Sequence, residues 1–215
     1  RSFHVTGVQT CALPIYILPY LAKLKAEARL PILFVSHQLE EVAALADRMA
    51  VVADGRIAAE GPVEEITARL DIRSFTERAE AGSILECAVK GHDRSHALTV
   101  LSLGAAELRI PLIGATTGER VRVRIRARDV SLATEAPHHI SILNVIPAAV
   151  AEIAEDTPPY VEVRLEAEGG AILARVTSLA LERLGLKRGS PAFALIKSVA
   201  FEGASGPERS RATMP

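Results

Sequence analysis

Short strand-like segments separated by turn residues fill the second half of the chain, and this pattern constrains the fold more than any other feature. The segments are 84–90, 97–103, 107–110, 120–126, 148–153, 160–166, 171–176 and 192–198. Regularly spaced short strands are typical of a small barrel or sandwich. Residues 168–170, Glu-Gly-Gly, predict a hairpin turn, and residues 179–184, closed by Gly185, predict the one helix of this half.

Residues 17–72 follow a different, mixed pattern that is typical of an α/β fold. Ile32-Leu33-Phe34-Val35 is a continuous apolar run, as expected of a strand buried on both faces in a parallel sheet. Helical spacing of apolar residues predicts helices on either side of this run. The other expected elements are helices at 17–28, 39–46 and 63–70, and a hairpin of 49–52 with 56–59 around Asp54-Gly55.

Length and charge narrow the function classes. The chain has 215 residues, 49% of them apolar, and a formal net charge of -1, which allows one or two packed domains. A protein whose main partner is nucleic acid usually carries a strong basic excess, so we expect no nucleic-acid partner. Cys11 and Cys87 stand alone, which favours a reducing, cytoplasmic setting. We expect no metal site, because His92, His96, His138 and His139 lack partners at metal-ligand spacing.

Residues 31–62, PILFVSHQLEEVAALADRMAVVADGRIAAEGP, closely resemble the switch-histidine region of ABC-type ATPase domains. The resemblance implies that this part is the C-terminal end of a P-loop ATPase domain and that Ser36 and His37 contact ATP. His37 would be the catalytic residue that senses the γ-phosphate, because ligands of open α/β sheets bind at the carboxyl ends of strands. We interpret Glu40 and Glu41 as solvating the following helix.

The remaining parts of such an ATPase are not found in this sequence. A P-loop needs a Gly-Lys pair, and none occurs. The acidic pair of the family would lie upstream of His37, where residues 1–16 hold no carboxylate and are interpreted as a non-native leader. We interpret Leu101 to Ala105 as a coincidental likeness to the family's signature loop. The chain is therefore expected to lack Walker A, signature and Walker B motifs and to be inactive alone, whereas the intact protein would use ATP and Mg²⁺.

The segments 141–147, 150–153, 173–177 and 194–199 together resemble the Mop-type, or TOBE, module, an OB-like small β-barrel. In importers this module is a regulatory appendage, and the Mop variant implies molybdate or tungstate. Ser141, Asn144, Lys197 and Ser198 fall on the family's oxyanion-binding positions; hydroxyl groups and a lysine suit a tetrahedral oxyanion. However, Leu143 stands where stand-alone Mop proteins commonly carry arginine. The alternative is that these residues only close the barrel and pair with a second subunit.

The expected organisation is a leader at 1–16, the C-terminal part of a nucleotide-binding domain at 17–75, a β-rich connecting segment at 80–136, a Mop/TOBE-like domain at 137–201 and a disordered tail at 202–215. Arginines at 120, 122, 124 and 126 alternate with apolar residues, and we interpret them as a solvated or salt-bridged strand face.

Together the resemblances imply the energy-coupling ATPase subunit of an ABC importer for molybdate or tungstate. Such a subunit would form a homodimer at the cytoplasmic face of the inner membrane and drive membrane permease subunits, with a periplasmic molybdate-binding protein as an indirect partner. Two alternatives stay open. One is a molybdate-binding Mop-type regulator or storage protein, and the other is an importer ATPase for sulfate, a sugar or a polyamine.

Overall fold

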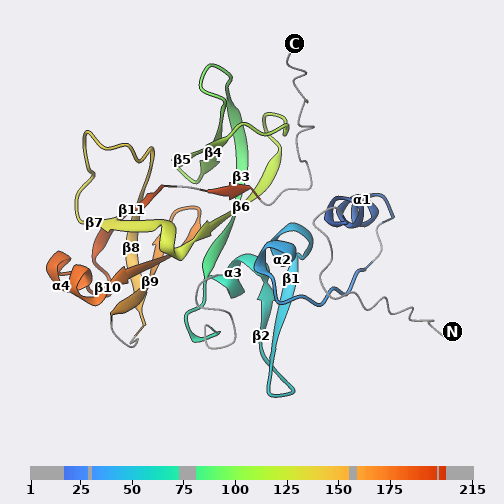
Figure 1. Ribbon diagram of the computed structural model, residues 1–215, viewed down its shortest axis with the longest axis horizontal. Helices are drawn as coiled ribbons and strands as arrows, with labels where there is room; N and C mark the ends of the chain where they lie inside the picture. Colours follow the sequence, from blue (N-terminus) through green and yellow to red (C-terminus); the bar gives the residue numbers. More distant parts are fainter. Residues whose placement is uncertain (1–16, 29–30, 73–80, 155–158, 198, 202–215) are drawn as a thin grey trace, which may run out of the picture.

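The computed structural model of the chain describes residues 17–28, 31–72, 81–154, 159–197 and 199–201 (Figure 1). The predicted leader at 1–16, the predicted disordered tail at 202–215 and the candidate ligand Ser198 lie outside these residues. Two five-stranded antiparallel sheets form most of the molecule, and a two-stranded hairpin with short helices precedes them. No helix among the described residues is long and apolar enough to span a bilayer.

The N-terminal region, residues 17–72, consists of three helices and one hairpin (Figure 1). Its elements are α1 (Leu18–Ala28), α2 (Leu39–Leu45), β1 (Arg48–Ala53), β2 (Arg56–Pro62) and α3 (Val63–Thr67). The predicted hairpin is confirmed, with β1 and β2 antiparallel. Asp54 and Gly55 adopt φ angles of 49° and 72°. Two successive left-handed residues are typical of the tight turn that matches the twist of a hairpin.

The strand that we predicted at Ile32 to Val35 is wrong. These residues form an irregular segment in which Leu33 is 95% exposed and Val35 is 89% exposed. A strand is held by hydrogen bonds to its neighbours, and in the part of the chain that the structure describes no strand pairs with this segment. An apolar run alone therefore does not form the strand.

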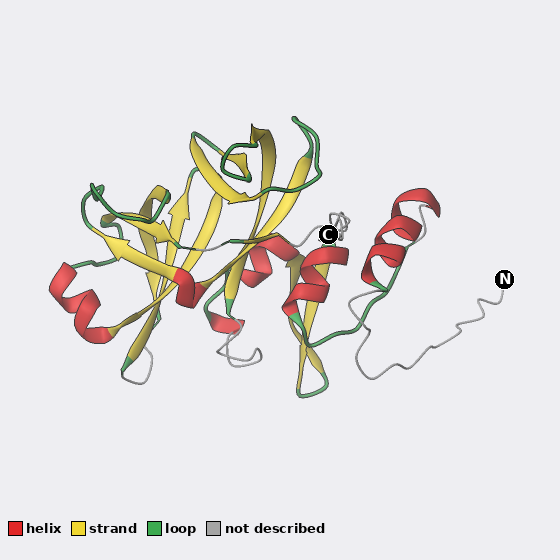
Figure 2. Cartoon of the chain, turned by 45° about the horizontal axis from the view of Figure 1, so that its top comes forward, coloured by secondary structure: helices red, strands yellow, loops and turns green. Residues whose placement is uncertain are grey.

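The β region, residues 81–201, contains the two larger sheets (Figure 2). Its elements are β3 (Gly82–Asp93), β4 (Leu98–Leu103), β5 (Ala106–Pro111), β6 (Arg120–Arg126), η3 (Ala127–Asp129), β7 (Val130–Ala133), β8 (Asn144–Ile153), β9 (Tyr160–Ala167), β10 (Gly170–Thr177), α4 (Ser178–Leu184), β11 (Pro191–Ile196) and β12 (Ala200–Phe201). The strand order is β12-β6-β3-β4-β5 in the first sheet and β10-β9-β8-β11-β7 in the second. The strand-rich prediction is confirmed, although β7 and β12 were not predicted.

The two sheets of the β region share one hydrophobic core. Residues of both sheets belong to it, among them Leu101 and Leu108 from the first and Leu165 and Ile172 from the second, all at 0% exposure. The sheets also exchange strands along the chain: β7 precedes residue 137 yet pairs with β11, and β12 follows β11 yet pairs with β6. Because of this exchange and the common core, the β region packs as one curled unit, which is called the barrel below.

Side chains on one strand also hydrogen bond to the backbone of the other sheet. The buried hydroxyl of Ser83 on β3 accepts from the backbone N–H of Leu173 on β10, at 2.8 Å. The Glu168 carboxylate accepts from the backbone N–H of Ala105 at 3.2 Å, where the β9–β10 turn meets the β4–β5 turn. These bonds satisfy backbone groups that sheet pairing leaves free.

Three of the four arginines of β6 fall into two environments, salt-bridged and buried. Arg120 pairs with Glu86 and Arg122 pairs with Glu64, so the salt-bridged face is confirmed at these two positions. Arg124 is only 1% exposed, so a solvated face is wrong there. The physical reason is that both faces of β6 are covered at this point, since the successive residues Val123, Arg124 and Ile125 are each at most 1% exposed.

Candidate functional site: the His37 segment and the start of β8

The irregular segment before α2 is tied to the helix through Ser36. Its hydroxyl donates to the carboxylate of Glu41 and accepts from the backbone N–H of Gln38, the latter at 3.0 Å. Glu41 lies on α2 and is 6% exposed, so our interpretation of Glu41 as a solvating residue is wrong. A buried carboxylate needs hydrogen-bond donors, and Ser36 supplies one. The side chain of Glu40 lies outside the described part of the structure.

His37 lies between these tethered residues and is exposed. Within the described residues its imidazole makes no hydrogen bond or ion pair. The predicted strand at Ile32 to Val35 is absent, so His37 follows an irregular segment and does not lie at the end of a sheet strand. The assignment of Ser36 and His37 to ATP therefore stays a prediction that rests on the sequence resemblance.

The C-terminal end of α2 meets two cations from other elements. Lys25 on α1 donates to the carbonyl of Leu45 at 2.9 Å and to Asp47 Oδ1 at 2.6 Å. Arg122 on β6 donates to the carbonyl of Ala46 at 2.6 Å. The last carbonyl groups of a helix carry partial negative charge and lack partners within the helix, so cations suit this position. Sequence reasoning missed both contacts.

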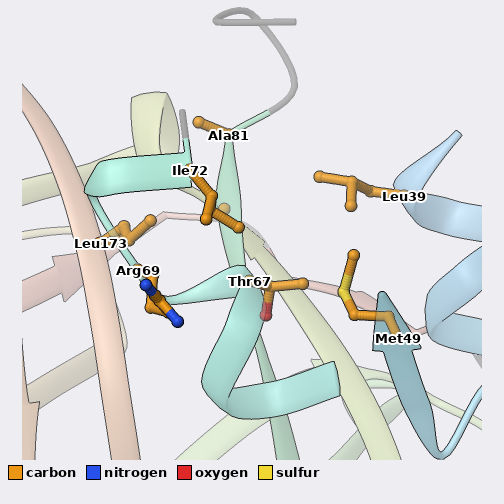
Figure 3. A pocket seen from close by; sticks show the side chains of 8 residues that line it. Leu39, Met49, Thr67, Arg69, Ile72, Ala81 and Leu173 are labelled. Atoms are coloured by element: carbon orange, nitrogen blue, oxygen red, sulfur yellow. The ribbon is translucent and has the colours of Figure 1, made fainter. Parts of the chain in front are cut away.

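An apolar contact, called the seam here, joins α2 and α3 to β3 of the β region. Ala43 on α2, Val63 on α3 and Ile84 on β3 form one buried cluster, with exposures of 0%, 0% and 1%. A small pocket opens beside this seam, where α2, α3, β3 and β10 meet (Figure 3). Its lining is mainly apolar, including Leu39, Ile72 and Leu173. The N-terminal region is thus packed directly against the β region.

The candidate oxyanion ligands that the structure describes lie at one end of the β8–β11 pair. Asn144 begins β8, and its register partner Ile196 precedes Lys197 at the end of β11. Ser141 comes just before β8. Ser141 and Lys197 are exposed. The structure therefore brings Ser141, Asn144 and Lys197 toward the same end of the barrel. In the sequence, all three lie more than 100 residues after His37.

Asn144 differs from the other candidates because its amide is already bound. The side chain is 3% exposed. Its Oδ1 accepts from the backbone N–H of Arg109 at 2.6 Å, and its Nδ2 donates to the Arg109 carbonyl at 3.0 Å. The Asn144 amide thus makes the two hydrogen bonds that the backbone of a paired strand residue would make with Arg109. These bonds join β8 of one sheet to β5 of the other. Among the described residues no group of three or more His, Cys, Asp or Glu side chains is placed to hold a metal ion.

Comparison with known proteins agrees with both halves of the sequence. Residues 140–201 match the TOBE domain family. The Molybdenum import ATP-binding protein ModC of Mesorhizobium japonicum is 42% identical over 189 residues, which cover 88% of this chain and 51% of the relative. The corresponding protein of Aromatoleum aromaticum is 44% identical, over 86% of this chain and 49% of the relative. The chain spans about half the length of the curated relatives it matches.

Among solved structures, the cytoplasmic molybdate-binding protein ModG with molybdate bound matches at a TM-score of 0.48 and 25% identity. The match covers 55% of this chain and 94% of the ModG chain, a likeness too weak to assign a fold. The sequence similarities are stronger and extend across the N-terminal and the β region. The chain is therefore similar over most of its length to molybdenum import ATP-binding proteins, and it carries a TOBE domain.

Proposed function

We propose that this chain is the C-terminal part of the energy-coupling ATPase subunit of an ABC importer for molybdate or tungstate. One observation carries the proposal: similarity to molybdenum import ATP-binding proteins runs through the His37 segment and the TOBE domain in a single alignment of 189 residues. The packing of α2 and α3 on β3 supports it further, because the two parts form a joined unit.

In this proposal His37 contacts the γ-phosphate of ATP. ATP bound with Mg²⁺ in the whole protein supplies the phosphoryl group whose transfer to water drives transport. Two properties of this chain fit the role. The His37 side chain is exposed and makes no hydrogen bond or ion pair with another described residue, whereas the neighbouring Ser36 donates to Glu41. An exposed imidazole on a segment that is tethered through Ser36 suits catalysis by positioning and charge stabilisation.

We propose that the whole protein acts as a homodimer with membrane permease subunits, at the cytoplasmic face of the inner membrane. A periplasmic molybdate-binding protein would deliver the cargo to the permease. The names of the relatives support an importer with ATP-binding subunits.

For the barrel, we propose a regulatory and dimerising role in which Asn144 serves the fold. The two bonds from its amide to Arg109 support this role, since they occupy the oxygen and one N–H of the side chain. Molybdate binding at Ser141, Lys197 and Ser198 is the alternative. Isothermal titration of the chain with molybdate, and with sulfate as the control, decides between them. No heat with molybdate is expected, and saturable heat that Lys197→Ala removes would establish the alternative.

A chimera tests the importer proposal. The N-terminal half of the Mesorhizobium japonicum relative is fused ahead of Ile17 and expressed in cells that hold its permease but lack its ATP-binding subunit. Cellular molybdenum is then measured by mass spectrometry. Restored molybdenum uptake that excess sulfate does not suppress is expected. A folded chimera that restores no uptake would contradict the proposal.

A further inference from the structure

The two regions of the molecule meet at the C-terminal end of α2, and Arg122 supplies the charged part of this contact. Besides donating to the Ala46 carbonyl, its guanidinium pairs with Glu64 of α3, Nε to Oε1, at 2.9 Å. It also lies 3.7 Å from Asp47 Oδ1. A single side chain of β6 thus holds the end of α2 and the start of α3.

These contacts are partly shielded from water. The side chain of Arg122 is 22% exposed and that of Glu64 is 28% exposed, whereas Asp47 is 67% exposed. Ion pairs that are partly buried are screened less by salt than exposed pairs. The hydrogen bond from Arg122 to the Ala46 carbonyl and the ion pair with Glu64 therefore carry the coupling, and the Asp47 contact adds little.

The opposite end of the same helix holds the His37 segment. Glu41 lies in the first turn of α2 and accepts from Ser36, which is adjacent to His37. Since α2 has only 7 residues, its two ends are separated by about two turns of a stiff helix. A shift at the Ala46 end therefore moves the Glu41 end, and Ser36 and His37 move with it.

We infer that Arg122 is a positioning residue that couples the β-barrel to the His37 segment through α2. This inference rests on the proposed function for its consequence in ATP turnover, but the coupling itself is a property of the chain. A change in the barrel, such as pairing with a second barrel, would alter the Arg122 contacts and thereby the position of His37. The barrel would then regulate turnover by moving a short helix. A physically connected element that both sites bias is what such coupling requires.

Arg120 offers a matched control on the same strand. Its guanidinium pairs with Glu86 of β3, and its side chain is 79% exposed. Both partners belong to the barrel, so Arg120→Gln removes one arginine charge from β6 without touching α2.

Hydrogen–deuterium exchange of the whole chain tests the coupling directly. Arg122→Gln is expected to speed exchange in residues 36–47 about fivefold, because charge-assisted bonds at the helix end are lost. Peptides from β3 and β4 should stay unchanged, Arg122→Lys should recover part of the protection, and Arg120→Gln should have no effect. Unchanged exchange in 36–47, or equal acceleration in all peptides, would overturn the inference.

Steady-state ATP hydrolysis by the chimera supplies the second readout. Arg122→Gln is expected to lower kcat about fivefold and to leave KM for ATP within about twofold, since ATP binding is left intact. Faster exchange with an unchanged kcat would overturn the positioning role. If the unmodified chimera hydrolyses no ATP, the proposed function fails, and the exchange result alone decides whether the coupling exists.

Discussion

The N-terminal region and the β region differ in how much apolar surface they leave exposed. In the N-terminal region Tyr20, Leu33 and Val35 are 74%, 95% and 89% exposed, whereas Leu101 and Leu165 of the β region are fully buried. The β region covers its own core because its two sheets pack together and exchange strands. The N-terminal region leaves these three apolar side chains in contact with water. The comparison shows that the β region encloses a large core between its sheets, whereas the N-terminal region has only a small cluster of its own at Val51, Ala59, Ile66 and Ile72.

Truncating one leucine in each region tests this contrast with the largest expected effect. Leu165→Ala should lower the free energy of unfolding by about 2–5 kcal/mol, because it leaves a cavity in a closed core. Leu33→Ala should change it by less than about 0.5 kcal/mol, because the side chain is already in water. Denaturant unfolding followed by circular dichroism measures both. Equal losses would show that the Leu33 side chain is buried in solution and would contradict the contrast between the two regions.

Asn144 tests how the two sheets are joined. Asn144→Ala should lower the free energy of unfolding by about 1–3 kcal/mol, because the Arg109 N–H and carbonyl lose their partners. Ser141→Ala, at an exposed position of the same barrel end, is the control and should be nearly neutral. The same denaturant titration applies. If Asn144→Ala is as neutral as the control, the Asn144 amide does not hold the sheets together.

Gly169 marks a close approach between the sheets. A Cβ at this position would lie 2.3 Å from Leu103 Cδ1 and 2.8 Å from the Leu103 carbonyl carbon. Gly169→Ala should therefore cost about 1–2 kcal/mol through overpacking. Gly114→Ala is the matched control, because a Cβ there meets nothing within 4 Å. Thermal unfolding compares the two variants, and a Tm for Gly169→Ala no lower than the control would show that the turn yields freely.

Labelling of the buried Cys87 thiol tests whether the core of the β region is closed, and it has the smallest expected effect on stability. Burial raises the pKa of its thiol from 9.0 to about 12. In a Cys11→Ser background we expect a thiol reagent at pH 8 to label Cys87 only after unfolding, because the thiolate is the reactive form. The raised pKa means that the unfolded chain loses the Cys87 proton at a lower pH than the folded chain does. The contribution of the neutral thiol to the free energy of unfolding is therefore complete below pH 9 and is lost as the pH rises toward 12. Rapid labelling of the native chain would show an open core.

Sequence patterns predicted the β region better than the N-terminal region, for a physical reason. Alternation such as that at 120–126 needs only neighbouring strands of the same unit, and these are present. The run from Ile32 to Val35 was predicted as a strand, but no described strand pairs with it. Turn chemistry was reliable at Asp54-Gly55 and Gly185, because φ angles are local properties.

Contacts between distant residues could not be predicted from one sequence. Arg122 and Ala46 are separated by 76 residues, and Asn144 and Arg109 by 35. The residues next to Arg122 and next to Asn144 in the sequence do not indicate which distant residue each one contacts. The family positions predicted Asn144 as an oxyanion ligand, which stays a prediction, and its hydrogen bonds to Arg109 became visible only with the structure.

The most direct measurement for the central claim is ATP turnover by the chimera after substitution of His37. His37→Ala should lower kcat by at least about 100-fold, the size expected when a positioned donor to the reacting phosphate is removed. His138→Ala, an exposed histidine of the barrel loop, should leave kcat unchanged. If His37→Ala hydrolyses ATP as fast as the unsubstituted chimera, His37 has no part in the reaction and the assignment of this chain to an ATPase subunit loses its chemical basis.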